Sequence, residues 1–292
     1  MSPTPSQRVL PLLTPCRLCE VRCGVDRLAG EVGPCGVGVD ARVYNAFVHM
    51  GEEPSLVPCF TVFLTGCNFR CVHCSDGEQV ERPGLGVPLD PSALAARVAA
   101  TEGLRSVEFV GGLPDVNLLA VARCAELLPP HLPVVLNTNA YFTLEALDSM
   151  SGWVDILVAD LKHGPGDCAA RIAGVDRYWG IVTRNLLAAA PRHRLLVRHL
   201  ILPGHLQCCT RPALEWLAAH LPEVEVNLMT GYRPLHRVAG IPGRLGRRLG
   251  ADATREVLGW EVTGRLTRLS VDGAPTSPLR RRAAAPGPSG TP

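Results

Sequence analysis

The most informative stretch of this chain is residues 60–74, which read Phe-Thr-Val-Phe-Leu-Thr-Gly-Cys-Asn-Phe-Arg-Cys-Val-His-Cys. Its first six residues are apolar or β-branched and predict a strand. Cys67, Cys71 and Cys74 follow at C-x3-C-x2-C spacing. Three thiolates this close can hold three irons of a cubane iron–sulfur cluster, for which four thiolates are usual. The fourth iron would then lack a protein ligand, and an open coordination position distinguishes a reactive metal centre from a closed structural one.

A zinc knuckle is the alternative interpretation of the same three cysteines. His73 or Cys59 would then supply the fourth ligand. The spacing alone leaves both interpretations open, so the rest of the chain has to distinguish them.

Composition and charge narrow the class of protein. The chain has 292 residues, of which 47% are hydrophobic and 19% charged, and its net charge is +2. These values indicate a globular protein and give no electrostatic case for nucleic acid or a membrane surface. No run reaches the roughly eighteen apolar residues needed to span a bilayer. The first eight residues lack the order of a secretory signal, and the twelve cysteines cluster at metal-ligand spacings, so we expect a reducing cytoplasm.

The middle of the chain alternates strand-type and helix-type segments, which is typical of βα units around a parallel sheet. Expected strands are 60–65, 106–110, 133–136, 154–159, 195–202 and 224–229, and expected helices are 92–100, 118–128 and 213–220. The helices have start signals at Asp90, Asp115 and Thr210. We therefore predict an α/β fold, a partial (β/α)6 barrel of the TIM type, although a doubly wound sheet would give a similar pattern. In either case ligands gather at the carboxyl ends of the strands.

The expected organisation has four parts. Residues 1–58 form an N-terminal Cys-rich segment, of which the Pro/Ser-rich start, residues 1–14, is expected to be loose. Residues 59–240 form the partial barrel, and 241–270 a C-terminal extension with one helix (253–260) and one candidate strand. Residues 271–292 are rich in Pro, Gly, Ser and Ala and are expected to be a disordered tail.

The motifs suited to ligand binding lie at the expected strand ends. Gly111-Gly112 follows the second strand and would allow the backbone to approach a ligand closely. Asn137-Thr138-Asn139 ends the third strand. Asp160-Leu161-Lys162 ends the fourth, with Asp160 and Lys162 on one face, where a structural salt bridge is the alternative interpretation. Arg198 lies in the fifth strand; His199, next to it, would point to the opposite face and belong to the core.

Together these motifs resemble the radical S-adenosylmethionine (SAM) superfamily, and most closely its branch of pyruvate formate-lyase activating enzymes and uncharacterised homologues. The resemblance covers most of residues 16–235. It implies that Cys67, Cys71 and Cys74 hold a [4Fe–4S] cluster whose open iron is chelated by SAM. It also implies a SAM-binding role for Gly111, Gly112, Asn139, Asp160, Lys162 and Arg198. Leu113 stands where the family's Gly-Gly motif has an acidic residue, so one side-chain contact is absent.

A second set of thiols precedes the barrel. Cys16, Cys19, Cys23 and Cys35 offer four ligands, which can close a metal site completely. Structural zinc and an auxiliary [4Fe–4S] cluster that relays electrons both remain open. Cys208-Cys209, after the fifth strand, could touch substrate or ligate a cluster, but two buried thiols are the simpler interpretation.

The resemblance implies reductive cleavage of SAM to a 5′-deoxyadenosyl radical that abstracts hydrogen from a substrate, with a reductant such as flavodoxin or ferredoxin. The first hypothesis is an activase for a glycyl radical enzyme. The second is radical modification of another protein, peptide or small molecule. The third is a non-catalytic iron–sulfur or zinc protein, which the residues at the strand ends argue against. No residue is assigned a catalytic role, because the cofactor performs the difficult step.

Overall fold

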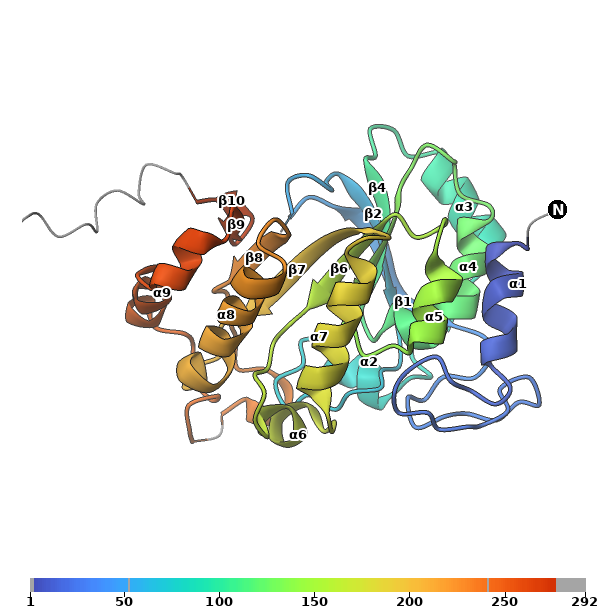
Figure 1. Ribbon diagram of the computed structural model, residues 1–292. Coiled ribbons are helices and arrows are strands. Elements are labelled where there is room, and N and C mark those ends of the chain that lie inside the picture. Colours follow the sequence, from blue (N-terminus) through green and yellow to red (C-terminus); the bar gives the residue numbers. More distant parts are fainter. Residues whose placement is uncertain (1–2, 52, 241, 277–292) are drawn as a thin grey trace, which may run out of the picture.

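The computed structural model describes residues 3–51, 53–240 and 242–276. Within these residues a ten-stranded sheet has the order β10-β9-β8-β7-β6-β5-β4-β2-β1-β3. Its two ends remain separate, so the sheet is a partial barrel rather than a closed one (Figure 1). The predicted fold class is confirmed.

The central part of the sheet consists of parallel strands in chain order. Neighbours pair in parallel from β2 through β9. The strands are β2 (Cys59–Leu64), β4 (Ser106–Val110), β5 (Val134–Thr138), β6 (Ile156–Asp160), β7 (Arg194–Leu200), β8 (Glu225–Met229) and β9 (Arg268–Val271). Six of them are the predicted strands, with ends shifted by at most two residues. The seventh, β9, is the strand that the sequence suggested for the C-terminal extension.

Antiparallel strands complete both edges of the sheet. β1 (Arg42–His49) pairs along β2, and β3 (Val87–Pro88) pairs with the start of β1. β10 (Ala274–Pro275) pairs with β9. β1 was not predicted, because this edge strand is only partly buried and lacks the continuous apolar run of the central strands.

Helices connect the parallel strands and cover one face of the sheet. Figure 1 shows α4, α5, α7 and α8 in a row along this face. The helices are α1 (Pro5–Val9), α2 (Gly77–Glu81), α3 (Pro91–Ala99), α4 (Leu118–Ala125), α5 (Leu144–Met150), α6 (Cys168–Ala173), α7 (Tyr178–Ala189), α8 (Arg211–His220) and α9 (Ala251–Leu258). Short turns of other helix types are η1 (Leu10–Leu12), η2 (Pro114–Asn117), η3 (Leu206–Thr210), η4 (His236–Val238) and η5 (Glu261–Arg265).

The helix start signals were partly right. Asp90 caps α3, because its carboxylate accepts from the Ser92 and Ala93 amides. Thr210 precedes α8, but its hydroxyl contacts His199 Nε2 at 2.9 Å instead of capping the helix. Asp115 is not a cap, because it lies inside η2, fully buried, and accepts a hydrogen bond from Thr138 Oγ1 at 2.6 Å.

The start of the chain is not loose as expected. Residues 5–9 form α1, which begins with a capping box between Thr4 and Gln7. Val9, Leu12 and Leu13 that follow are buried in the main core. Burial of these apolar side chains against the barrel helices fixes a segment whose Pro/Ser content suggested mobility. Most of the tail predicted for 271–292 lies outside the described residues.

The apolar interior has two parts that place the functional site. The main core lies between the sheet and the helices. A smaller cluster on the other face consists of Leu56, Val135, Ile156, Val158 and Leu196. Because this cluster fills the interior near the amino ends of β5, β6 and β7, the open space lies at their carboxyl ends.

None of the helices in the described residues combines the length and apolar character that a membrane span needs.

Candidate active site

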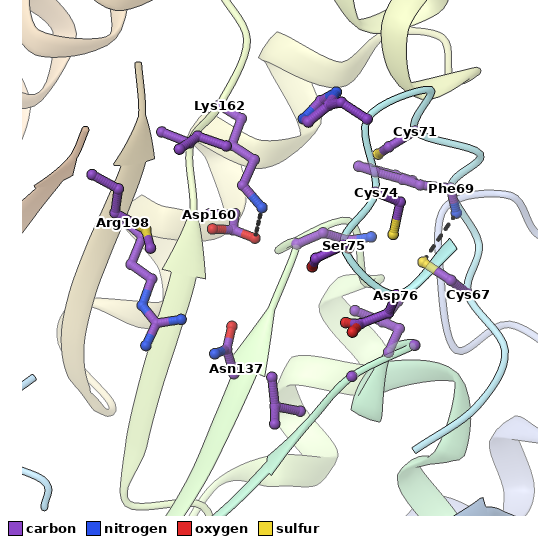
Figure 2. Close-up of a pocket in the computed structure, with 18 of the residues that line it drawn as sticks. Cys67, Phe69, Cys71, Cys74, Ser75, Asp76, Asn137, Asp160, Lys162 and Arg198 are labelled. Carbon is purple, nitrogen blue, oxygen red and sulfur yellow. Dashed lines mark hydrogen bonds and ion pairs between the residues drawn. The ribbon is translucent and has the colours of Figure 1, made fainter. Parts of the chain in front are cut away.

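The three cysteines of the C-x3-C-x2-C motif lie on the loop that follows β2 and line one cavity of about 460 Å³ (Figure 2). Backbone hydrogen bonds fix this loop, residues 66–75. The Cys67 amide donates to the Cys35 carbonyl at 3.1 Å, and the Arg70 and Val72 amides donate to Ala173 and Ile172 at 2.8 and 2.9 Å. The loop is therefore held both by the N-terminal segment and by α6.

The environment of these thiols fits a metal cluster. Burial raises the pKa of Cys67 well above its usual value and that of Cys71 to about 12, although the Lys162 charge partly lowers the latter. Bound iron would hold them as thiolates despite this burial. The Phe69 amide lies 3.4 Å from Cys67 Sγ and donates to it. His73 Nδ1 in the same cavity is buried with no protein partner.

The zinc-knuckle alternative finds little support in this geometry. Cys59 begins β2, at the opposite end of the strand from the loop, and contacts Thr61 and Glu108. A single zinc ion needs ligand atoms that lie close to one another. In the described part of the chain, the group of His, Cys, Asp or Glu ligand atoms that lie within 4.8 Å of one another does not include Cys67, Cys71 or Cys74.

The two glycines after β4 permit a close backbone approach. Gly111 and Gly112 have φ values of +67° and +43°, a region that glycine adopts without strain. A Cβ atom on Gly112 would lie 2.4 Å from the Gly66 carbonyl oxygen. Replacement by any other residue would therefore push this turn against the start of the cysteine loop. Both glycines line the cavity.

Asp160 and Lys162 form an ion pair at the end of β6, where Figure 2 shows both facing the cysteine loop. The distance from Lys162 Nζ to Asp160 Oδ2 is 2.5 Å. Burial lowers the pKa of Lys162, but the neighbouring Asp160 carboxylate outweighs burial and raises the pKa above its usual value. The salt bridge expected as the alternative is thus present, and it lies inside the candidate cofactor cavity rather than on a remote surface.

Arg198 lines the cavity but is already engaged by a carboxylate. Arg198 Nε donates to Glu53 Oε1 at 2.7 Å, and Arg198 Nη2 donates to Glu53 Oε2. The pair is buried, and Asn227 Nδ2 donates to Glu53 Oε1 at 3.1 Å. A direct contact between Arg198 and SAM stays a prediction. His199 faces the other way, as predicted, and contacts the Leu161 carbonyl oxygen at 2.5 Å.

Asn139 connects the end of β5 with the cysteine loop. Its Nδ2 donates to Asn68 Oδ1 at 2.8 Å, and its Oδ1 accepts from the Tyr141 amide at 3.1 Å. Asn137 lines the same cavity and donates to Glu108 Oε1 at 3.1 Å. The structure therefore brings every predicted SAM-site residue to one cavity.

Sequence reasoning missed several residues of this site. Glu53 and Glu108 bind Arg198 and Asn137, and Asp76 accepts from the Tyr44 hydroxyl at 2.9 Å. Burial raises the pKa of Asp76 despite this hydrogen bond. These three carboxylates do not stand at a regular spacing in the sequence, so only their tertiary contacts could identify them as part of the site.

The four N-terminal cysteines also come together. Cys19, Cys23 and Cys35 line a second cavity of about 450 Å³, which is also lined by Arg27 and Asn68. Cys16 is buried and interacts with Cys23. The Arg27 guanidinium donates to Cys35 Sγ at 3.2 Å. Because the Cys35 carbonyl accepts from the Cys67 amide, this second set lies directly beside the cysteine loop.

Comparison with known proteins agrees with this geometry. The sequence profile of the radical SAM superfamily matches residues 61–217, more than half of the chain. The chain belongs to the radical SAM superfamily. Membership implies a [4Fe–4S] cluster and SAM as cofactors, and the cavity that holds the three thiols and the strand-end motifs fits both.

The relatives leave the substrate open. The chain is 35% identical over 241 residues to an uncharacterized protein, MJ0674, of Methanocaldococcus jannaschii, covering 80% of this chain and 70% of the relative. The structure of SuiB from Streptococcus suis has a TM-score of 0.51 and 16% identity, which shows the shared fold. That match covers 71% of this chain and 46% of SuiB, so the chain spans less than half of SuiB.

Proposed function

We propose that this radical SAM enzyme takes a hydrogen atom from a glycine of a partner enzyme, as an activase for a glycyl radical enzyme does. When bound, the cluster and SAM supply the 5′-deoxyadenosyl radical that performs such a hydrogen abstraction. The resemblance of the strand-end motifs to activating enzymes supports this role. The chain's own residues have to bind SAM, orient it and admit the substrate.

The SAM-binding part of the proposal rests on charge and backbone. Lys162 and Asp160 place one charge of each sign beside the thiols, and these can face the carboxylate and amino groups of a bound amino acid. Gly111 and Gly112 leave their backbone accessible at the same cavity. The Glu53–Arg198 pair would hold its part of the cavity lining in place, without contacting the atoms of SAM and substrate that react.

The observation that supports a protein substrate is the edge strand β1, whose last residue, His49, lines the cavity. In the described residues, β3 pairs only with Arg42 and Val43 of β1, which leaves the outer edge of 45–49 without a strand partner. Phe47 on this edge is 40% exposed and stacks on Phe63, whose centroid lies 5.3 Å away and which lines the cavity. An unpaired edge with an apolar side chain can add an extended segment of a partner protein as a further strand.

Three measurements test the proposal. Anaerobically purified protein with a chemical reductant, or with flavodoxin or ferredoxin, should form 5′-deoxyadenosine from SAM. Addition of a protein with a C-terminal glycyl-radical signature, encoded by a neighbouring reading frame, should give a glycyl-radical signal in electron paramagnetic resonance. Phe47→Ser should reduce that signal while leaving uncoupled SAM cleavage intact. Val32→Ser, a 58% exposed apolar residue of the N-terminal segment, is the matched control.

The outcomes separate the competing functions. Formation of 5′-deoxyadenosine without a glycyl radical would contradict the activase role and favour modification of another protein, peptide or small molecule. An intact cluster that never cleaves SAM would indicate an electron carrier or a scaffold. The activase role is abandoned in both cases.

The N-terminal cysteines belong to the same proposal as a second metal site. Contact between Cys35 and Cys67 through one backbone hydrogen bond suits an auxiliary cluster that passes electrons to the first. Structural zinc is the other candidate, because the segment 16–36 has little regular structure of its own. Metal analysis of a Cys16→Ser, Cys23→Ser variant distinguishes them: loss of about four irons indicates a cluster and loss of about one zinc a structural site.

A further inference from the structure

Three cysteines and one histidine form a compact group outside the active-site cavity. The Sγ atoms of Cys168, Cys208 and Cys209 and a ring nitrogen of His205 all lie within 4.8 Å of one another. Cys168 Sγ lies 3.6 Å from Cys208 Sγ and 3.5 Å from His205 Nδ1. Cys208 Sγ lies 3.4 Å from His205 Nδ1 and 3.9 Å from Cys209 Sγ. None of the four lines the cavity that holds Cys67, Cys71 and Cys74.

Four of the six separations match the edges of a tetrahedron around a single ion, and the other two are below 4.8 Å. With Zn–S bonds of about 2.3 Å and Zn–N bonds of about 2.0–2.1 Å, a tetrahedral site has S···S edges of about 3.8 Å and S···N edges of about 3.5 Å. The measured distances of 3.4–3.9 Å fall on these values. In a cubane cluster each thiolate binds a different iron, and a set this compact leaves no room for such a core.

The fold builds this group from two neighbouring strand ends. Cys168 is the first residue of α6, in the connection after β6. His205, Cys208 and Cys209 come from the connection after β7, at spacings i, i+3 and i+4 that share one helix face. The turn here is a π-turn, in which the Thr210 amide donates to the His205 carbonyl at 3.2 Å. Such turns are rare and occur frequently at functional sites.

Charge and burial agree with a closed metal site. Cys168 and Cys209 are 3% and 1% exposed, so two of the four ligands are removed from water. Three thiolates, a neutral imidazole and a divalent cation leave one net negative charge. Arg171 Nη2 lies 3.7 Å from Cys168 Sγ and donates toward it, which offsets that charge.

We propose that Cys168, His205, Cys208 and Cys209 bind one structural Zn²⁺ ion, which joins the connections after β6 and β7. The ion also supports the active site, because α6 begins at one ligand and ends at the cysteine loop. Ile172 and Ala173, at the end of α6, accept the Val72 and Arg70 amides of that loop. Gly164 packs against the same connection, and a Cβ atom there would lie 1.9 Å from the Cys208 carbonyl oxygen.

The test measures metal content, which does not depend on the substrate or on SAM cleavage. The full chain is purified anaerobically, passed over a weak chelating resin and analysed for zinc and iron. The variants are Cys208→Ser, which changes an exposed side chain, and Cys168→Ser/Cys208→Ser. Cys124→Ser, a buried cysteine of α4 in neither thiol set, is the control.

The expected result is one zinc per chain fewer in the double variant than in the wild type and in Cys124→Ser. Iron content should be equal in all of them, which also shows that the variants fold. Hydrogen exchange of residues 67–75 should be faster in the double variant, because α6 has lost its anchor. That last readout would not change if the four side chains were only neighbours in the core.

Other results would overturn the proposal. Equal zinc in all proteins would show that the group binds none. Loss of iron instead of zinc would assign the site to a different metal. A wild-type mass about 2 Da lower than expected, with Cys168 joined to Cys208, would show a disulfide where the ion is proposed. Each of these results leaves the proposed activase function untouched, because that function is tested by SAM cleavage and radical formation.

Discussion

The cysteine loop after β2 and the N-terminal segment 16–36 both gather thiols, yet they present them to different surroundings. The loop's three thiols face a cavity that also contains the Asp160–Lys162 pair and the Gly111–Gly112 turn. The N-terminal thiols lie near Arg27, which is 2% exposed and whose guanidinium contacts Cys35 Sγ and the Val116 carbonyl oxygen. The first arrangement offers three thiols beside an ion pair and a glycine turn, whereas the second offers four thiols and a counter-charge in a cavity of similar size. The neighbours of the thiols, more than their number, determine what a metal bound there can do.

The short turn η2 forms hydrogen bonds with both regions. On one side the Val116 carbonyl accepts from Arg27 Nη1 at 2.6 Å. On the other, Asn117 Nδ2 donates to the Thr65 carbonyl at 3.0 Å, directly before the cysteine loop. A change in one region can therefore reach the other through backbone contacts.

The largest expected difference between the regions is in SAM cleavage. Cys71→Ser should lower 5′-deoxyadenosine formation by at least about 100-fold, because it removes a cluster ligand. Cys16→Ser should retain measurable cleavage and the iron of the first cluster. The assay is product formation under anaerobic conditions, with Cys59→Ser as a buried-thiol control. Equal loss in Cys71→Ser and Cys16→Ser would remove the distinction drawn between the two sets.

The charged pair provides the second test of the open site. Lys162→Met should raise the KM for SAM by about 10-fold or more, because the buried Asp160 carboxylate loses its partner and the site loses a cation. Arg82→Met breaks the exposed Arg82–Glu78 pair and should have almost no effect. Steady-state kinetics and SAM binding measure both variants. An unchanged KM in Lys162→Met would exclude this pair from the SAM site.

The close approach at Gly112 gives a smaller effect, on stability as well as on activity. Gly112→Ala should lower the unfolding free energy by about 2 kcal/mol or more, because it adds a clash with Gly66 to an unfavourable φ. Gly103 also has a positive φ, +74°, but a Cβ atom added there would meet no atom within 4 Å, so Gly103→Ala should cost only about 1 kcal/mol. Denaturation of both variants gives the comparison. Similar losses of unfolding free energy in the two variants would show that the close approach of the Gly112 and Gly66 backbones contributes little to stability.

The last expected effect is a pH dependence of stability that arises in η2, the turn that contacts both regions. Burial raises the pKa of Asp115 to about 7, although the Thr138 hydrogen bond partly lowers it. The folded protein thus binds this proton more tightly than the unfolded chain, whose aspartate pKa is about 3.9. The contribution to stability is complete below pH about 4 and is lost as the pH rises through 7, by at most about 1.4 kcal/mol per pH unit.

Asp115→Asn should remove this dependence. The difference in unfolding free energy between wild type and variant should shift in favour of the variant from pH 5.5 to 7. Chemical denaturation at several pH values measures it. A constant difference over that range would show that Asp115 does not titrate there.

The sequence predicted the parts of the fold that depend on local pattern. Apolar β-branched runs located six parallel strands, because strands buried on both faces must be apolar throughout. The edge strand β1 and the helix α1 escaped prediction for the opposite reason. β1 is only partly buried, and α1 is five residues long, so its capping box needs the packing of Val9 and of the following Leu12 and Leu13 onto the barrel to hold it.

The same division holds for the candidate site. The spacing of Cys67, Cys71 and Cys74 and the pairs at the strand ends predicted a cluster loop and a SAM site, because ligand spacing and strand ends are local features, and the family match agrees with the superfamily that they indicated. The partners Glu53 and Glu108, and the meeting of Cys168 with His205, Cys208 and Cys209, were decided only by tertiary structure. Glu53, Cys168 and His205 lie on separate connections and Glu108 lies within β4, and the sheet brings each of them to its partners across tens of residues, a distance over which sequence spacing indicates no contact.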